Sequence, residues 1–441
     1  MDRTALSTLT ILAICVPAFA AQPAANKQVK SQPAPQSPAA PEIALQPPAA
    51  SVLLLEKYHK GAYAEVAKEG PALLATEPLN HELRLNVANS LAWTGHTKEA
   101  MAQYQMLAGT DYEQRGTLGY AHVNRWTGRP DRAAASYRKY LQGKAESASD
   151  IVEAREGLRL ASRELRPQTA AQIGRASNSN DTFRTTAILS HRWRNDTGAR
   201  IFEVAAGRAE ENNHALRLVQ RDLTFRYEDL DALFAPQIEL SAQQSPRSHL
   251  FGAATVKVAD MPAYITVGHL NWGRLAFDPS ALRDGLTANQ VGGKADFGNP
   301  LGEFGLAYNI YRISDRNTIH DANLRFVPAR QPFQSVKIFT GLEARKARFN
   351  DSRYWSPEDG HYSAFAGLSA DWTNSQWQGY GSIQYGVPLG GDSGNSWSAG
   401  GGVKRWLGDE WAIGFDFWAM HTPRDGGYRS SSAMLRLEKL W

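Results

Sequence analysis

The sequence predicts an α + β multidomain protein, with helical repeats first and a C-terminal antiparallel transmembrane β-barrel of about 16 strands after them. Two observations predict this order. The helix-like spacing of apolar residues ends near residue 168 and gives way to an alternation of apolar and polar residues. The chain also finishes on "SSSAMLRLEKLW", where Leu435, Leu437 and Trp441 fall on one face of a strand. Such a strand needs apolar surroundings up to its last residue, which a barrel in lipid provides.

Residues 1–20 predict a secretory signal peptide. Arg3 precedes a mostly apolar stretch, and Ala18-Phe19-Ala20 has the small-x-small pattern of a cleavage site. The single cysteine, Cys15, lies inside this segment, so we expect a mature chain without disulfides or metal thiolates. Residues 21–50 are rich in Pro, Ala and Gln and predict a semi-extended linker. No later run reaches the roughly 18 apolar residues that a membrane helix needs.

Residues 51–167 predict helical pairs. Gly61, Gly95 and Gly128 are 34 and 33 residues apart, and each lies between two helix-like runs. Over about residues 47–147 this pattern resembles the tetratricopeptide family, with three units; it departs at Gly70, where an aromatic residue is expected. We expect a last helix, from Asp150 to about Leu165, to cover the end of the stack. A plain helical bundle is the alternative.

Residues 168–441 predict the barrel. Alternating segments of about ten to fourteen residues are separated by turn sequences such as "RNDTGA" and "FGNPLG". A soluble β-sandwich needs only about seven to nine strands. Aromatic residues near the ends of the apolar faces are typical of membrane-interface girdles: Trp193, Tyr227, Tyr362, Trp372, Trp377 and Trp411. We therefore expect an outer-membrane barrel in contact with lipid, with the helical domain in the periplasm.

The last strand is expected to close the barrel and to place Trp441 at a membrane interface. Its aromatic end resembles the signal that the bacterial barrel-insertion machinery recognises, so this machinery is an expected partner. Lys439 departs from that signal, because an apolar residue is expected two positions before the end.

Nothing in the sequence predicts catalysis. "GDSG" at residues 391–394 falls in a turn, and no HExxH or His-x-His spacing offers zinc ligands. After residue 168 acids and bases are about equal in number, so no basic stripe predicts nucleic-acid binding. We expect no enzyme activity, no cofactor and no metal.

A barrel of this size encloses a water-filled channel. The positions predicted to face inward mix aromatic, amide and carboxylate side chains, which suit the passage of sugars: Glu239, Tyr311, Glu343, Tyr380, Gln384, Asp416 and Trp418. Ordinary lumen wall explains each of these residues singly at least as well.

The order of signal peptide, helical repeats and barrel resembles the outer-membrane exopolysaccharide secretins, the export porins for poly-N-acetylglucosamine and cellulose. Locally the resemblance is best at "RYWSPEDGHYSAF", residues 353–365; the helical part is much shorter than in that family. The resemblance implies that a glycan polymer passes through the lumen and that the helices dock polymer or periplasmic or inner-membrane synthesis proteins. The docking residues that it implies are Trp93, Tyr104, Trp126 and Tyr137, most of which fit an inter-helix core equally well.

Two other functions stay open at this point. One is a protein translocator of the surface-lipoprotein assembly modulator type, which also joins helical repeats to a barrel, of about fourteen strands. The other is a phage or surface receptor. The segment of residues 276–286, "AFDPSALRDGL", is long enough either to fold into the pore or to form an outer loop.

Overall fold

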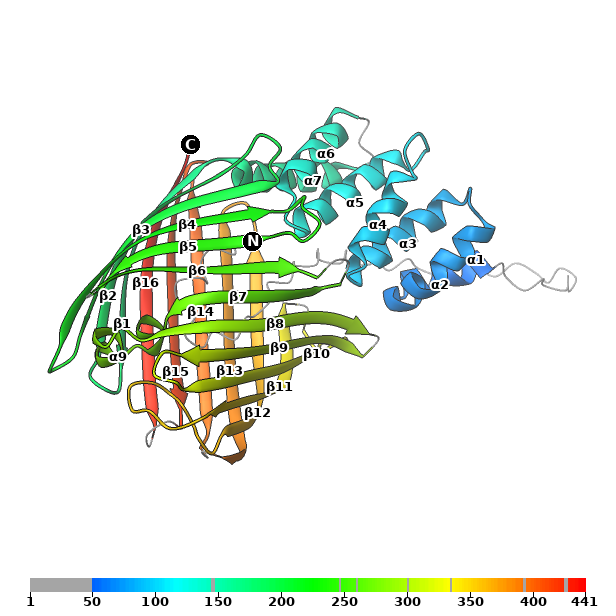
Figure 1. Ribbon diagram of the computed structural model, residues 1–441. Coiled ribbons are helices and arrows are strands. Elements are labelled where there is room, and N and C mark those ends of the chain that lie inside the picture. Colours follow the sequence, from blue (N-terminus) through cyan, green and yellow to red (C-terminus); the bar gives the residue numbers. More distant parts are fainter. Residues whose placement is uncertain are drawn as a thin grey trace, which may run out of the picture. The chain divides into compact units, whose positions relative to one another are not determined.

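A computed structural model describes residues 50–143, 147–245, 247–258, 261–299, 301–333, 335–391, 394–423 and 427–441 (Figure 1). The predicted signal peptide, all of the predicted linker except residue 50, and residues 392–393 of the "GDSG" turn lie outside the described residues. The chain forms two compact units. Of the described residues, one unit holds 50–128 and Arg132–Leu158, and the other holds Arg129–Asp131 and Arg159–Trp441.

The helical part confirms the predicted pairing. Its helices are α1 (Ala50–His59), α2 (Tyr63–Thr76), α3 (His81–Trp93), α4 (Thr97–Gln105), α5 (Glu113–Trp126), α6 (Pro130–Gln142) and α7 (Ala148–Leu165). Gly61, Gly95 and Gly128 lie in the turns of the first three pairs, with φ of 78°, 86° and 78°. This left-handed conformation costs glycine little, which explains the spacing seen in the sequence. No helix among the described residues is long and apolar enough to cross a membrane.

Small residues allow these helices to approach one another. A Cβ on Gly119 of α5 would collide with the ring of Tyr104 from α4, and a Cβ on Gly157 of α7 would collide with Tyr137 from α6. A Cβ on Gly70 would collide with Val87. Gly70, which departs from the family pattern, therefore provides the close contact between α2 and α3.

The rest of the chain confirms the predicted barrel, which is antiparallel and closed with 16 strands (Figure 1). The strands are β1 (Gln168–Asn178), β2 (Phe183–Arg194), β3 (Arg200–Asn212), β4 (Arg217–Asp229), β5 (Gln237–Gln244), β6 (Ser248–Lys257), β7 (Ala263–Asn271), β8 (Thr287–Asn299), β9 (Gly302–Ile313), β10 (Thr318–Pro328), β11 (Val336–Ala347), β12 (His361–Thr373), β13 (Trp377–Gly391), β14 (Ser396–Leu407), β15 (Trp411–Thr422) and β16 (Tyr428–Leu440). We call the end where β1 begins and β16 finishes the Gln168 end. The opposite end is the α8 end, after helices α8 (Trp272–Ala276) and α9 (Pro279–Arg283), which lie between β7 and β8.

The last strand closes the barrel as predicted. β16 pairs with β1 from Gln168 opposite Leu440 to Asn178 opposite Ser430, and it also pairs with β15. Lys439 is accommodated because its Nζ lies 3.8 Å from the ring centroid of Trp441 and 5.3 Å from that of Trp411. Cation–π contacts of this kind let a lysine lie among interfacial aromatic residues.

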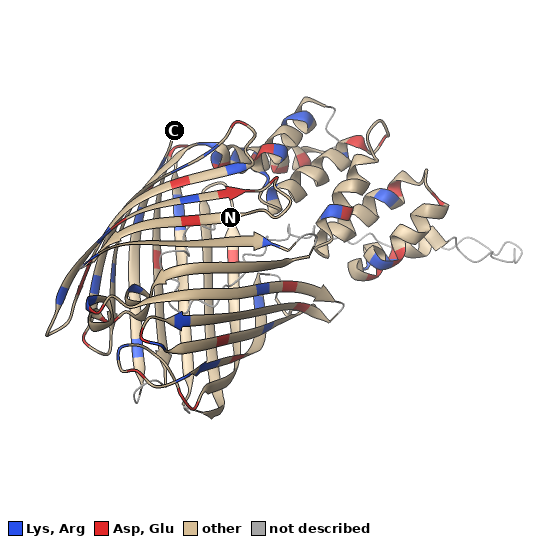
Figure 2. Ribbon diagram, in the orientation of Figure 1, with Lys and Arg blue, Asp and Glu red and all other residues tan. Residues whose placement is uncertain are grey.

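The two faces of the barrel wall differ in polarity. Alternate strand residues on the outer face are exposed and apolar, among them Leu189, Leu223, Ile265, Ile383 and Leu435. Neighbouring outer rings near the Gln168 end contact one another. Trp193 stacks on Phe202 at a centroid distance of 5.5 Å, and Phe202 lies tilted against Tyr227 at 5.4 Å. Figure 2 shows charges of both signs spread over the barrel. An apolar outside with an aromatic girdle is what a bilayer requires.

Candidate functional site

The inner face of the wall is polar and is linked by ion pairs between neighbouring strands. Arg226 of β4 lies 2.8 Å from Glu203 of β3 and 2.7 Å from Glu239 of β5. Residues on either side of this set, such as Leu223 and Leu240, face outward and are exposed. Glu239 therefore lies on the inner face of the wall.

The strand register places the other predicted residues on the same face. Tyr311 packs on Trp272 with a centroid distance of 5.2 Å, and Glu343 accepts a 2.7 Å hydrogen bond from Ser363. The Tyr380 hydroxyl donates to Asp416 at 2.9 Å. The remaining two residues, Gln384 and Trp418, also lie on the inner face. Gln384 is four residues from Tyr380 on β13 and Trp418 is two residues from Asp416 on β15, and side chains an even number of residues apart in a strand share a face. Contact of any of the seven with a substrate stays a prediction.

The four residues predicted for docking divide into two pairs. Tyr104 and Tyr137 are only 5% and 0% exposed, so they belong to the inter-helix core, and the expectation that their rings line a docking face is wrong. Their hydroxyl groups hydrogen-bond Asn89 and His122 at 2.7 and 2.8 Å. Trp93 and Trp126 keep part of their surface exposed, and docking at these two stays a prediction.

His122 is a buried titratable group of the helical part. Burial lowers the pKa of His122 to about 4. Its ring is therefore neutral at pH 7, where Nε2 lies 3.3 Å from Glu153 of α7 and Nδ1 faces the Tyr137 hydroxyl. These contacts join α5, α6 and α7.

The segment between β7 and β8 is the one inter-strand connection of the described barrel that folds into two helices. The Asn271 side chain caps α8 by accepting from Arg274 N, and Asp278 caps α9 by accepting from Ser280 N at 2.8 Å. A Cβ on Gly273 would meet the backbone of Leu282, so glycine there allows α8 and α9 to touch. Local sequence thus makes residues 272–286 compact.

This compact segment crosses the mouth of the lumen. Asn178 of β1 donates to Phe277 O at 3.0 Å, while Trp272 packs on Tyr311 of β9. β1 and β9 are eight places apart (9 − 1) in a ring of 16, so they lie on opposite walls. A segment that contacts both walls must span the space between them. Residues 276–286, for which two directions were open, fold inward.

Different interactions fix the segment at its two sides. Towards β8–β11 it joins an apolar cluster of Trp272, Ala281, Leu286, Ala288, Ile313, Ile319, Ala347 and Tyr354. Towards β1–β4 the contacts are polar. Arg274 lies 3.4 Å from Asp222, and Arg184 donates to Arg274 O at 2.9 Å while its guanidinium lies over the Phe277 ring.

A second set of contacts fastens the segment to the loops of the α8 end. Arg353 lies 2.6 Å from Asp351, 3.0 Å from Asp284 after α9, and 3.2 Å from Asp315. The hydrogen bonds that Arg353 donates to Asp351 are the main reason that the pKa of Arg353 is raised. The pKa of Asp351 is lowered mainly by Arg353, and that of Asp284 mainly by Arg283 and then by Arg353.

Tyr354 completes this set, which we call the Arg353 cluster (Asp284, Asp315, Asn317, Asp351, Arg353 and Tyr354). Its hydroxyl donates to Asp315 at 2.6 Å and accepts from Asn317 at 3.0 Å. Burial raises the pKa of Tyr354, so it stays neutral. The resemblance drew attention to "RYWSPEDGHYSAF", but its role as a fastener between loops could not be predicted, because Asp284 and Asp315 are distant in the sequence.

Among the residues that the structure describes, no group of three His, Cys, Asp or Glu side chains is arranged to hold a metal ion. The described inner wall instead presents paired charges and aromatic rings, and α8 and α9 cross it at one mouth.

Comparisons with known proteins agree with this fold. No family model and no curated protein matches the sequence. A solved structure titled bacterial polysaccharide outer membrane secretin is similar, with a TM-score of 0.50 and 12% identity over 63% of this chain and 99% of that chain. CdiB from Acinetobacter baumannii has a TM-score of 0.38 and 10% identity, over 62% of this chain and 60% of that chain. The outer membrane protein opdK from Pseudomonas aeruginosa has a TM-score of 0.35 and 9% identity, over 63% of this chain and 99% of that chain.

The likeness to the secretin, at its low identity, is one of fold. The chain has a closed barrel of the outer-membrane type. This architecture supports an outer-membrane location and a role as a channel or in transport.

Proposed function

We propose that this protein is a passive outer-membrane channel that exports a polysaccharide through its lumen, and that its helical part lies in the periplasm and docks polymer or synthesis proteins. One observation supports the proposal above the others, a closed 16-strand barrel whose inner wall presents aromatic rings beside hydrogen-bonding groups. The fold likeness to a polysaccharide secretin agrees with it.

The arrangement of β13–β15 suits a sugar chain. β14 lies between β13 and β15, and its Gly400 and Gly402 are paired with Trp418 and Asp416 of β15. A Cβ on Gly400 would meet the Trp418 ring, and a Cβ on Gly402 would meet Asp416 and the Tyr380 ring. These rings therefore lie against a wall without side chains and turn a face to the lumen, where Tyr380 is 44% exposed. A pyranose ring can stack on such a face while Asp416 exchanges hydrogen bonds with its hydroxyl groups.

Planar-bilayer recordings of the purified full chain test the proposal. We expect steady ion conductance that a neutral hexasaccharide, maltohexaose, interrupts in brief events. Tyr380→Ala is expected to shorten these events about fivefold, because a stacking contact is worth about 1 kcal/mol. Tyr385→Ala is the matched control, since Tyr385 lies on the same strand, faces outward and is 50% exposed. Absence of conductance, or equal effects of the two variants, would contradict the proposal.

Gene deletion separates export of a glycan from the translocation of a surface lipoprotein. We expect loss of surface polysaccharide with unchanged surface lipoproteins. The 16 strands of the barrel favour the glycan channel over a translocator of about fourteen strands. A deletion strain that keeps its surface glycan but retains a lipoprotein in the periplasm would favour the translocator over the glycan channel.

A further inference from the structure

We propose that the Gln168 end of the lumen holds a binding site for an anionic group, formed by Arg163, Arg166, Arg192, Lys404 and Trp406. This inference rests on the proposed function and narrows it. The exported polymer would have carboxylate or phosphate groups rather than being neutral.

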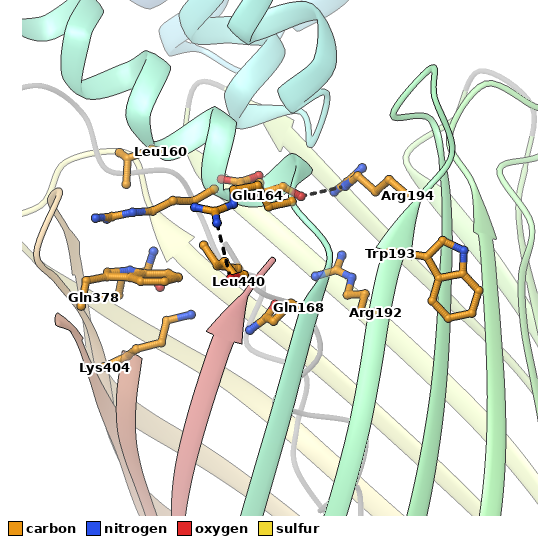
Figure 3. A pocket seen from close by; sticks show the side chains of 12 residues that line it. Leu160, Glu164, Gln168, Arg192, Trp193, Arg194, Gln378, Lys404 and Leu440 are labelled. Carbon is orange, nitrogen blue, oxygen red and sulfur yellow. Dashed lines mark hydrogen bonds between the residues drawn. The ribbon is translucent and has the colours of Figure 1, made fainter. Parts of the chain in front are cut away.

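A cavity marks the site, with a volume of about 60 Å³. It lies where the end of α7 meets the strands on either side of the barrel closure (Figure 3). Its lining residues are Leu160, Arg163, Glu164, Arg166, Gln168, Arg192, Trp193, Arg194, Gln378, Lys404, Trp406 and Leu440. The space is large enough for a small ionic group together with water.

Positive charge is in excess around this cavity. Five of its lining residues are Arg or Lys and one, Glu164, is acidic. Three carboxylates next to the cavity pair with its cations, Asp409 with Arg163 at 3.1 Å, Glu410 with Arg166 at 3.6 Å and Glu438 with Lys404 at 3.2 Å. Glu438 is also approached by Arg436 at 3.4 Å, so one carboxylate serves two cations there.

Two buried donors of the cavity also lack acceptors. Arg163 Nε and Trp406 Nε1 find no hydrogen-bond partner among the described residues, although the two residues are only 6% and 8% exposed. The terminal nitrogens of Arg163 are already used by Ser375 O, by Gly408 O at 3.0 Å and by Asp409. A buried donor without an acceptor is unfavourable, and an anionic oxygen in the cavity would supply the missing acceptor.

The electrostatics of Arg163 agree with an anion at this place. Burial lowers the pKa of Arg163, and the neighbouring charges of Arg159 and Arg166 lower it further, against the opposite effect of Asp409. Burial and the two neighbouring arginines thus outweigh the effect of Asp409 on this pKa. A second negative group would complete the compensation.

The charged groups also converge. Figure 3 shows Arg192 on β2 and Lys404 on β14 pointing into the same space, with Gln168 of β1 between them, whereas Trp193 points away from it. Guanidinium forks and an ammonium group are the donors that proteins use for carboxylates and phosphates. The proposed site therefore has the donor set for such a group.

Block of the channel by charged sugars tests the site. In bilayers of neutral lipid we expect hexagalacturonate, with one carboxylate per residue, to block at about tenfold lower concentration than maltohexaose, because hydrogen bonds to a charged group are stronger than those between neutral groups. Inorganic phosphate should compete with it. Lys404→Gln and Arg192→Gln should each raise the blocking concentration about fivefold.

Lys337→Gln is the matched control, because Lys337 also lies near the Gln168 end of its strand but does not line the cavity. Heat-modifiable migration in gels shows that each variant barrel is folded. If the two sugars block equally, or if Lys337→Gln raises the blocking concentration as much as Lys404→Gln and Arg192→Gln do, the anion site is wrong but the channel function is not contradicted. A channel without conductance contradicts the proposed function itself. Relief of block on adding anionic lipid overturns the polymer site in favour of a lipid headgroup.

Discussion

Arginine side chains occupy both ends of the barrel, in different surroundings. At the α8 end Arg353 lies within 3.2 Å of three aspartates. At the Gln168 end five cations and one carboxylate line the cavity, and three adjacent carboxylates, Asp409, Glu410 and Glu438, pair with Arg163, Arg166 and Lys404. A compensated guanidinium fixes loops in place, whereas an under-compensated one is available to a ligand. The comparison teaches that the balance of charge around an arginine, rather than its presence, separates a structural role from a binding role.

The largest expected effect comes from the segment that the Arg353 cluster holds. Replacement of residues 272–286 by a short Gly-Ser turn should raise single-channel conductance at least about threefold, because a protein obstacle leaves one mouth of the lumen. Unchanged conductance would show that the segment does not limit the pore.

Removing the compensated arginine comes next. Arg353→Ala leaves Asp284, Asp315 and Asp351 close together without their shared partner, and should lower the free energy of unfolding by about 2 kcal/mol, since Arg353 is partly exposed. Urea titration of the barrel in detergent measures this. Arg192→Gln, at the other end, should change the same free energy by less than about 0.5 kcal/mol. A similar loss of unfolding free energy in Arg353→Ala and Arg192→Gln would contradict the difference between the two ends of the barrel.

Acid should weaken the α8 end. The pKa values of Asp284 and Asp351 are lowered in the folded protein. Their stabilisation is therefore fully present above the unfolded value of about 3.9 and is lost as the pH falls through the lower folded values. We expect conductance steps between open levels to become frequent below about pH 4. Recordings from pH 6 to pH 3 should show this in the wild type and a smaller change in Arg353→Ala, where Asp284 keeps its contact with Arg283.

The smallest expected effect concerns one hydroxyl group. Tyr354→Phe removes the hydrogen bonds to Asp315 and Asn317 from a side chain that is 2% exposed. The free energy of unfolding should fall by about 1 kcal/mol, with conductance unchanged. A loss as large as that of Arg353→Ala would show that the hydroxyl, not the guanidinium, fastens the loops.

Much of the barrel could be predicted from the sequence, because lipid outside and water inside impose a period of two that survives in every strand. That period places all seven predicted lumenal residues on the inner face. The direction of residues 276–286 could not be predicted, since it depends on Asn178 and Asp222, distant in the chain. The burial of Tyr104 and Tyr137 could not be predicted either, because an aromatic residue at a repeat position fits a core and a docking face equally well. Each ring packs against a glycine of another helix, Gly119 or Gly157, and the sequence does not show these pairings.

The unequal attachment of α8 and α9 has a mechanical consequence. Hydrocarbon contacts with β8–β11 resist separation in any ionic medium, whereas the contacts of Arg274 and Arg184 with the opposite wall compete with dissolved ions. A polymer that entered from the Gln168 end would therefore separate residues 272–286 from β1–β4 first, and would leave the barrel between this segment and β1–β4. The same side of the barrel holds the cavity near the barrel closure, which is lined by residues of β1 and β2.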